Sequence, residues 1–252
     1  MANRFMLTLV VAFCICTSCT NTQKIAYFRG AEDTAFRAAL PVLEAPFQKN
    51  DLLTIKISSL NAKASADFNQ SSGAEGANNQ GASYMIDNSG NIEIPMLGTI
   101  KAEGLTKKQL KERVTDVILE KKLLLEPIVE IRQLNFDVTI LGEVTKPTVI
   151  NVPSERISLV KALGLAGDLT IYGKRDNILL IREEDGARVT RRLNINSSEF
   201  LNSPYYYLKP NDVVYVEPNG AKVAVSGRSQ QIIPIVFTGI SILLLVLDKV
   251  IK

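Results

Sequence analysis

The sequence predicts an α+β fold followed by a C-terminal membrane helix. Several short stretches alternate apolar and polar residues, which is the pattern of half-buried strands. Two segments combine helical spacing with capping residues, and an uncharged apolar run lies near the C-terminus. The chain has 252 residues, 46% hydrophobic and 22% charged, which is enough for one large or two small globular domains.

Composition excludes several classes of function. The chain has no His, so Ser-His-Asp triads, Cys-His triads and His-ligated zinc sites are impossible. A formal net charge of +3 is too small to indicate a nucleic-acid partner, because phosphate binding needs a clustered excess of Lys and Arg. Composition thus excludes His-dependent sites and disfavours a nucleic-acid partner; we expect no catalytic residue, no metal ligand, no cofactor and no nucleic acid.

The first segment has the features of a bacterial lipoprotein signal. Arg4 is followed by an apolar run over residues 5–15, which is too short to span a bilayer. All three Cys lie within the first 19 residues, and Cys19 follows the small residue Ser18. We predict that residues 1–18 are removed and that Cys19 is lipidated; ordinary signal-peptidase cleavage near a free Cys is the alternative.

Strand patterns begin at residue 51. Leu53, Ile55 and Ile57 alternate with polar residues, as in a strand with one buried face. Residues 61–83 are rich in Ala, Ser, Asn, Gln and Gly, which predicts an exposed loop. Residues 84–95 are predicted to form two short strands around an Asn-Ser-Gly turn.

Two helices are predicted from caps and spacing. Thr106 with Gln109 forms a capping box that begins the first helix, and Pro127 is expected to stop it. The Lys and Arg residues along this helix indicate a solvated face, with contact to an anionic glycan or lipid as the alternative. The second helix is predicted over residues 158–166, with Gly167 at the C′ position.

Acidic and Asn-Asp turns punctuate the predicted strands. Asp185-Gly186 is a hairpin turn signal between residues 177–182 and 187–193, so Glu183 and Glu184 are interpreted as turn residues too. Asn-Asp precedes an apolar strand twice, at residues 50–51 and 211–212. An Asn-Asp pair makes a side-chain-stabilised turn, so we interpret both pairs as structural.

The last segment is predicted to span a membrane over residues 232–251. Ile232 to Leu247 holds sixteen residues without a charge, about 24 Å of helix, and extension to residue 251 reaches about 30 Å. Pro234, Thr238 and Ser241 share one face with Gly239 nearby, which suits helix packing in a bilayer. A buried core helix is the alternative.

These features together resemble the bacterial outer-membrane polysaccharide export lipoproteins over about residues 46–218. The first part resembles their polysaccharide export domain, in Asn50-Asp51 before an apolar strand, in the turn and Pro-x-Leu-Gly of residues 87–98, and in Gly104-Leu105-Thr106. The second part resembles a soluble-ligand-binding β-grasp domain, in Gly142-Glu143-Val144 with Pro147, in Ala166-Gly167-Asp168 where the family usually has Ala-Gly-Gly, and in Leu208–Val213. The residues that carry these turn motifs are Asp51, Gly90, Pro95, Gly98, Gly142, Gly167 and Asp212.

The resemblance implies a polysaccharide export domain followed by one β-grasp-like domain and a C-terminal transmembrane helix. The predicted divisions are a signal peptide (1–18), a lipidated leader (19–45), the export domain (46–135), the soluble-ligand-binding β-grasp domain (136–218), a linker (219–231) and the membrane helix (232–251).

The resemblance also implies function. Members are non-enzymatic subunits that export capsular or exopolysaccharide across the outer membrane. They form homo-oligomeric rings, octamers in the best-known type, and act with an inner-membrane polysaccharide copolymerase, often a tyrosine autokinase. We therefore expect polysaccharide, copolymerase, further copies of the chain and membrane lipid as partners. The expected location is the outer membrane with the body in the periplasm. The inner membrane is the alternative, because Lys249 and Lys252 flank the predicted helix as the positive-inside rule expects of a cytoplasmic end.

Two other functions remain open. The first is a monomeric glycan-binding envelope lipoprotein. Tyr205, Tyr206 and Tyr207 form the aromatic cluster of the chain, and strand alternation would point Tyr206 away from its neighbours. We interpret the cluster as core or subunit packing, with glycan contact as the alternative. The second is an envelope hydrolase that pairs Asp185 with Glu183 or Glu184, since glycosidases need only two carboxylates.

Overall fold

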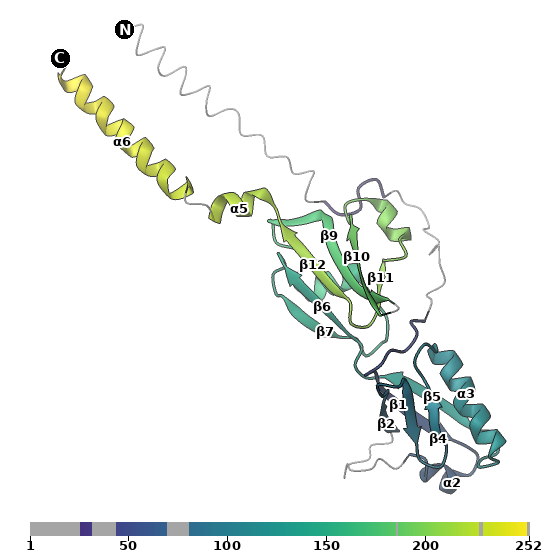
Figure 1. Ribbon diagram of the computed structural model, residues 1–252. Coiled ribbons are helices and arrows are strands. Elements are labelled where there is room, and N and C mark those ends of the chain that lie inside the picture. The colour runs from purple at the N-terminus through teal and green to yellow at the C-terminus, as the bar shows by residue number, and fades with distance from the viewer. Residues whose placement is uncertain (1–25, 32–43, 70–80, 185, 227–228, 251–252) are drawn as a thin grey trace.

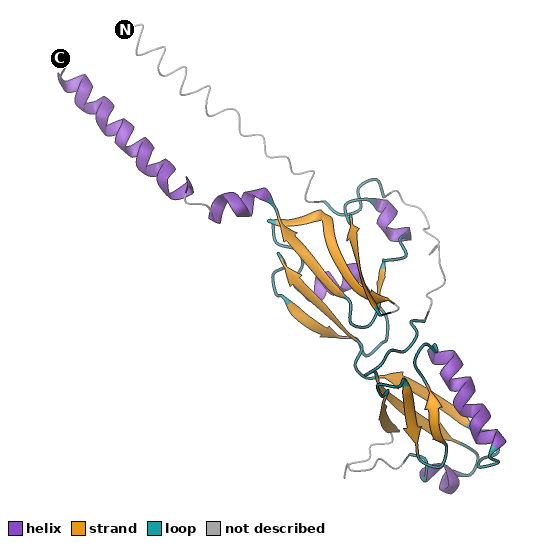
Figure 2. Ribbon diagram, viewed as in Figure 1, coloured by secondary structure: helices purple, strands orange, loops and turns teal. Residues whose placement is uncertain are grey.

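The computed structural model describes residues 26–31, 44–69, 81–184, 186–226 and 229–250 (Figure 1). It has the mixed α+β class that the sequence predicts. Two hydrophobic cores form, one from residues between 47 and 131 and one from residues between 136 and 216. We call the parts around them the N-terminal lobe (residues 44–134) and the C-terminal lobe (residues 135–218). Figure 2 shows the strands of the two lobes as separate sheets.

The N-terminal lobe is a three-stranded antiparallel sheet with a helix and a hairpin. The sheet order is β2-β1-β5, and β3 pairs with β4 in a separate hairpin. The helix α3 packs against β5. The elements are β1 (Leu52–Ser58), α2 (Ala62–Ala66), β2 (Ala82–Met85), β3 (Asn91–Ile94), β4 (Gly98–Lys101), α3 (Lys107–Glu120) and β5 (Ile128–Gln133).

The alternation in β1 and the helical spacing in α3 create this core. Leu53, Ile55 and Ile57 are buried on one face of β1, as predicted. The capping box also forms: the Thr106 hydroxyl accepts the Gln109 N–H at 3.3 Å, and the Gln109 side chain accepts the Thr106 N–H at 2.8 Å.

The C-terminal lobe is a five-stranded mixed sheet with one helix against it. The order is β10-β9-β12-β6-β7, in which β12 runs parallel to β6 and the other neighbours are antiparallel. A small sheet pairs β11 with β8. The elements are β6 (Asp137–Gly142), β7 (Thr148–Asn151), β8 (Ile157–Ser158), α4 (Leu159–Leu165), β9 (Gly173–Glu184), β10 (Ala187–Leu193), the 3-10 helix η2 (Ser198–Asn202), β11 (Tyr207–Leu208) and β12 (Val213–Pro218).

The second predicted helix and the predicted hairpin are confirmed. Ser158 caps α4 by accepting the Lys161 N–H at 3.2 Å, and Gly167 follows the helix at φ +78°. The strands β9 and β10 pair on either side of the acidic turn. Asp185, which belongs to this turn, lies outside the described residues.

The local predictions for the N-terminal lobe fail in three places. The expected loop over residues 61–83 contains α2, and Phe68 is buried in the core. The first strand of residues 84–95 pairs with β1 and not with β3, because Asn50 and Asp51 exchange backbone hydrogen bonds with Ile86. The helix α3 ends at Glu120, well before Pro127, because Lys122 adopts a positive φ of 55°.

Two helices follow β12 at the C-terminus. They are α5 (Gly220–Ser226) and α6 (Ser229–Val250), and α6 extends away from the C-terminal lobe (Figure 1). In the part of the chain that the structure describes, no helix has the length and apolar character needed to cross a membrane. The membrane span predicted for residues 232–251 is therefore not supported; its uncharged run of about 24 Å is shorter than a typical bilayer core of about 30 Å.

Candidate functional site

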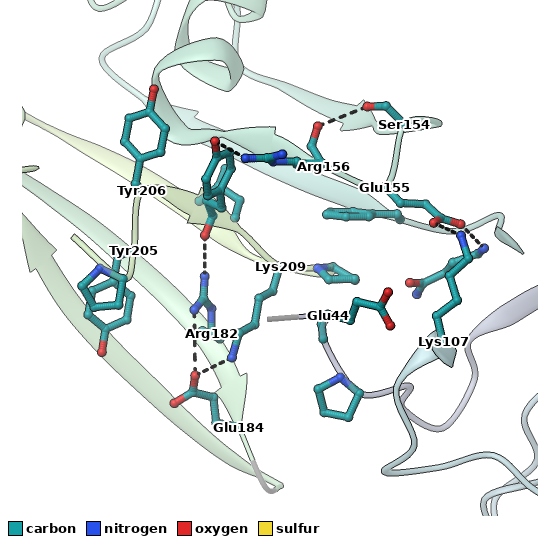
Figure 3. A pocket seen from close by; sticks show the side chains of 18 of the residues that line it. Glu44, Lys107, Ser154, Glu155, Arg156, Arg182, Glu184, Tyr205, Tyr206 and Lys209 are labelled. Atoms are coloured by element: carbon teal, nitrogen blue, oxygen red, sulfur yellow. Dashed lines mark hydrogen bonds and ion pairs between the residues drawn. The ribbon is translucent and has the colours of Figure 1, made fainter. Parts of the chain in front are cut away.

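A cleft of about 910 Å³ lies where the two lobes meet. Its walls come from the segment before β1, from the start of α3, from the loop after β7, and from the segment that leads through β11 (Figure 3). This volume lies within the range of small-molecule and ligand clefts in proteins, which often form between domains. The cleft is therefore the candidate functional site.

Glu155 joins the two lobes on one side of the cleft. Its Oε2 lies 2.5 Å from the Lys107 Nζ at the start of α3, and its Oε1 accepts the Gln133 N–H at 2.8 Å. Glu155 adopts a positive φ of 53°, which directs its side chain across the lobe boundary at some cost in backbone strain. A weaker bond of 3.5 Å joins the Gln48 side chain to the Glu183 carbonyl.

The three tyrosines of the aromatic cluster all line the cleft, and all are half-buried. The predicted alternation does not apply, because β11 begins only at Tyr207. Tyr206 packs between two rings, with its centroid 5.7 Å from that of Phe200 and 5.0 Å from that of Tyr207. Core packing and access to the cleft are therefore combined in one cluster.

Arginines hold two of these rings in place. The Arg156 guanidinium lies 4.2 Å from the ring centroid of Tyr207 and donates to its hydroxyl. The Arg191 Nε donates to the Tyr205 hydroxyl at 2.8 Å. The Arg182 guanidinium lies 5.6 Å from the Tyr205 ring centroid.

A buried ion pair supports this wall from behind. Arg182 donates to both carboxylate oxygens of Asp212, at 2.8 and 2.6 Å, and the two side chains are 5% and 0% exposed. Arg182 also lies 3.9 Å from Glu184, and the Lys209 Nζ lies 3.1 Å from Glu184. The Lys209 ammonium is the main cause that lowers the pKa of Glu184.

The lowered pKa of Glu184 argues against this residue as the general acid of the hydrolase hypothesis. A glycosidase acid needs a raised pKa so that it is protonated at neutral pH. Glu184 instead stays ionised in its contacts with Lys209 and Arg182, and Asp185 lies outside the described residues. Among the described residues, no group of His, Cys, Asp or Glu is arranged to hold a metal ion.

The two Asn-Asp pairs form the same turn in the two lobes. Asn50 and Asn211 adopt positive φ angles of 66° and 65°. In each turn the buried Asp accepts a backbone N–H three residues earlier at 2.8 Å, from Gln48 for Asp51 and from Lys209 for Asp212. The turns differ in charge compensation: Asp212 faces Arg182, whereas no ion pair is formed by Asp51 within the described residues, and burial raises its pKa.

The remaining motif residues lie at turns outside the cleft. Gly142 ends β6 at φ +90°, where a Cβ would lie 2.1 Å from the Val216 carbonyl oxygen of the neighbouring strand. Glycine is therefore required there by both backbone conformation and space. The others on turns or strand ends of the two lobes are Gly90, Pro95, Gly98 and Gly167.

The predicted lipid and membrane residues do not join the cleft. Cys19 lies outside the described residues. On α6, Ile232, Pro234, Thr238, Gly239 and Ser241 are exposed, and the side chain of Leu247 lies outside the description. The hydroxyls of Thr238 and Ser241 are satisfied within the helix, by the carbonyls of Pro234 and Phe237 at 2.7 and 2.8 Å.

A short part of the leader docks on the C-terminal lobe. The Tyr27 hydroxyl donates to Asp168, and the Phe28 and Arg29 N–H groups donate to the carbonyls of Ile195 and Asn196 at 3.1 and 2.5 Å. Burial, and then Asp168, raise the pKa of Tyr27 to about 12. Asp168 stands where the resembled family usually has Gly, so this chain has an acceptor for Tyr27 at that turn.

Sequence reasoning found the tyrosines but missed the charged residues of the cleft. Lys107, Glu155 and Arg156 come from segments far from the tyrosines along the chain. Lys107 joins the group because the two lobes meet, and Arg156 reaches Tyr207 through packing within the C-terminal lobe. The sequence has no local pattern that predicts either contact. The repeated Asn-Asp turn was the one signal that pointed to the buried Asp212.

Comparisons with known proteins support the resemblance. Residues 44–134 match the family described as polysaccharide biosynthesis/export protein. A relative from Ralstonia solanacearum, described as "EPS I polysaccharide export outer membrane protein EpsA", is 26% identical over 149 residues, which cover 58% of this chain and 39% of the relative. A relative of the same description from Ralstonia nicotianae (strain ATCC BAA-1114 / GMI1000) is 27% identical over 150 residues, covering 58% and 38%.

The match therefore spans about two fifths of the length of each relative. The matched residues 44–134 coincide with the N-terminal lobe, including the Asp51 turn, the capping box of α3 and the turns at Gly90 and Gly98. Through this lobe, the chain is similar to the polysaccharide biosynthesis/export family.

Proposed function

We propose that this chain is a non-enzymatic subunit of an oligomeric envelope translocon that exports capsular or exopolysaccharide across the outer membrane. The observation that carries the proposal is the family match of the N-terminal lobe. Both relatives are described as polysaccharide export outer membrane proteins, which favours the outer membrane over the inner membrane.

The proposal also covers lipid attachment at Cys19 and the role of residues 136–218. Cys19 would be lipidated and would hold the body in the periplasm, with the lipid as the membrane contact. Residues 136–218 would act as a soluble-ligand-binding β-grasp domain. The mixed sheet with α4 packed on it, and β12 parallel to β6, supports that reading of the C-terminal lobe.

The proposed partners are further copies of this chain in a ring and an inner-membrane polysaccharide copolymerase. The exported polysaccharide is the proposed substrate, and the tyrosines at the cleft are its proposed contact on this chain. The family resemblance is the basis for proposing these partners. The cleft is the place on this chain where glycan binding can be measured.

Deletion and complementation test the proposal. Deleting the gene should remove surface polysaccharide while its intracellular synthesis intermediates persist, and the full chain should restore export. Unchanged surface polysaccharide in the deletion strain would contradict the proposal. Loss of both the intermediates and the surface polymer would indicate a role in synthesis instead.

Lipid labelling tests the attachment. The Cys19→Ala variant should lose incorporation of a labelled fatty acid, whereas Cys14→Ala, which changes a residue of the predicted signal, should keep it. Labelling that persists in Cys19→Ala would refute the assignment of the lipidated residue. Membrane fractionation of the same strains separates outer-membrane from inner-membrane attachment.

The cleft favours one second candidate, a monomeric glycan-binding envelope lipoprotein. A pocket lined by tyrosines and arginines can bind a glycan without any ring. Native mass measurement of the full chain in mild detergent distinguishes the two functions: a ring subunit gives an oligomer, and an independently acting lipoprotein gives a monomer.

A further inference from the structure

We propose that the cleft between the lobes binds an acidic sugar unit of the polysaccharide, with the Arg156 guanidinium as the partner of its carboxylate. The inference rests on the proposed export function for the identity of the ligand as a glycan. The charge, geometry and exposure of the cleft residues supply the acidic character of that glycan.

The charges of the cleft leave one cation available. Four lining side chains are cationic (Lys107, Arg156, Arg182 and Lys209) and three are acidic (Glu44, Glu155 and Glu184). Three of the cations have acidic partners, because Lys107 binds Glu155, Lys209 binds Glu184 and Arg182 binds the buried Asp212. Within the described residues, Arg156 forms no ion pair.

The remaining acid of the cleft is also accounted for. The Glu44 carboxylate accepts the Lys108 backbone N–H at 3.1 Å in the first turn of α3, where the helix favours a negative charge. An anionic ligand therefore faces an unpaired guanidinium, while the three acids are held by groups of the protein itself. This arrangement favours an anion over a cation in the cleft.

Arg156 is exposed but oriented. Its guanidinium stacks 4.2 Å from the Tyr207 ring centroid and donates to the Tyr207 hydroxyl. The Tyr207 ring is itself held by the Tyr206 ring, which meets it edge-on at an interplanar angle of 89°. A guanidinium that is held in this way loses less conformational entropy when it binds a carboxylate in a bidentate manner.

Tyr207 is thus a positioning residue for Arg156, and the other tyrosines add amphipathic surface. Tyr205 and Tyr206 are half-buried at the cleft, so each presents part of an apolar ring and a polar hydroxyl group. Such side chains suit a sugar, which has apolar ring faces and polar edges. The cavity of about 910 Å³ is large enough for a ligand of oligosaccharide size.

Binding measurements on the full-length chain in detergent test the inference. The probes are tetragalacturonate, which carries carboxylates, and maltotetraose, which is neutral. We expect tetragalacturonate to bind by calorimetry with an affinity that falls as NaCl is raised, and maltotetraose to bind at least about tenfold more weakly. Equal binding of both probes would overturn the acidic assignment.

Two variants locate the site. Arg156→Gln should weaken tetragalacturonate binding by about tenfold, because a charge-assisted contact is lost. Arg188→Gln removes an exposed arginine of β10 that does not line the cleft, and should leave the affinity unchanged. Equal losses in both variants would indicate only general attraction to a basic surface and would overturn the site.

Tyr207→Phe gives a readout of positioning. It keeps the ring under Arg156 but removes the hydroxyl acceptor, so the loss of tetragalacturonate affinity should be smaller than in Arg156→Gln. In a chain that already carries Arg156→Gln, Tyr207→Phe should cause no further loss of affinity. Additive losses in the double variant would overturn the role of Tyr207 as a residue that acts through Arg156.

The failure of this inference is distinguishable from failure of the proposed function. Normal surface polysaccharide in the deletion strain together with loss of tetragalacturonate binding in Arg156→Gln would refute export and keep the acidic site. Lost export in the deletion strain together with unchanged binding in Arg156→Gln would refute the site and keep export.

Discussion

Replacing Asp212 by Asn would test whether the buried ion pair behind the cleft stabilises the C-terminal lobe. Asn can still accept the Lys209 N–H that Asp212 accepts at 2.8 Å, so the turn is retained. The negative charge opposite Arg182 is lost, and the amide NH2 group takes the place of Oδ1, the oxygen 2.8 Å from the Arg182 Nε. The variant therefore isolates the charge from the turn.

The structure sets the size of the effect. Arg182 is 5% exposed and Asp212 is 0% exposed, so the arginine would be left as a buried charge without its main partner. Breaking such a pair costs about 3–5 kcal/mol, and the lower end applies because Arg182 retains Glu184 at 3.9 Å. With a urea m-value of about 2 kcal/mol/M, a loss of about 3 kcal/mol lowers the midpoint by about 1.5 M.

Urea unfolding followed by circular dichroism and tyrosine fluorescence measures this shift. The double variant Arg182→Met/Asp212→Asn removes both charges and should recover most of the lost stability. A double variant at least as unstable as Asp212→Asn would refute the reasoning, because the cost would then not arise from an unpaired charge.

Asp51→Asn is the matched control in the other lobe. Asp51 makes the same turn without an ion pair in the described residues, so its replacement should cost less than about 1 kcal/mol at pH 7. Burial raises the pKa of Asp51, so the folded state favours its protonated form. That contribution to stability is present below the unfolded pKa of about 3.8 and is lost as pH rises through the folded pKa. The free energy of unfolding of Asp51→Asn, relative to that of the unmodified chain, should therefore be more favourable at pH 7 than at pH 3.5.

We expect measurable effects from substitutions at Gly142, Tyr27 and Glu155. Gly142→Ala should lower the melting temperature markedly, because its Cβ would lie 2.1 Å from the Val216 carbonyl oxygen at a φ of +90°; the strain alone costs about 1–3 kcal/mol. Tyr27→Phe should remove one late step from the ultraviolet titration of the tyrosines, because the pKa of Tyr27 is about 12; the stability that its raised pKa contributes should be present below pH 10 and lost between about pH 10 and 12. Glu155→Asn tolerates the positive φ but is too short to bridge the lobes, so the Gln133 amide should exchange its hydrogen faster, at a cost of about 1 kcal/mol.

Each of these has an outcome that would contradict it. Gly104→Ala also changes a glycine at positive φ, +80°, but no atom lies within 4 Å of the added Cβ, so an equal loss in both glycine variants would exclude the clash as the cause. An unchanged titration curve in Tyr27→Phe would mean that the Asp168 contact does not form in solution. Unchanged exchange of the Gln133 amide in Glu155→Asn would mean that Glu155 does not hold the lobes together.

Local structure was predictable where a short pattern determines it. The alternation of Leu53, Ile55 and Ile57 fixes a strand face, and the Thr106–Gln109 pair satisfies backbone groups within one turn. These patterns involve residues within four positions of one another. The end of α3 was not predictable from Pro127, because Lys122 in a left-handed conformation stops the helix first.

The cleft was not predictable because its contacts join residues far apart in the chain, across the lobe boundary for Lys107 and Glu155 and within the C-terminal lobe for Arg156 and Tyr207. Glu155 and Lys107 are separated by 48 residues, and Arg156 and Tyr207 by 51. Strand alternation also gave the wrong arrangement for Tyr206, because only two residues of that segment pair as a strand. Tertiary contacts between loops therefore determine this site, and periodic patterns do not describe them.

The docking of Tyr27 would limit the distance between the fold and a lipid on Cys19. If Cys19 carries the lipid, only eight residue steps separate the lipid from Tyr27, and a fully extended chain of that length reaches about 28 Å at most. Because Tyr27 is bound to Asp168, this tether would end on the C-terminal lobe and keep that lobe within this reach of the lipid. Lengthening the chain between residues 20 and 26 would then change the height of the whole molecule above the lipid without altering a contact within the described fold.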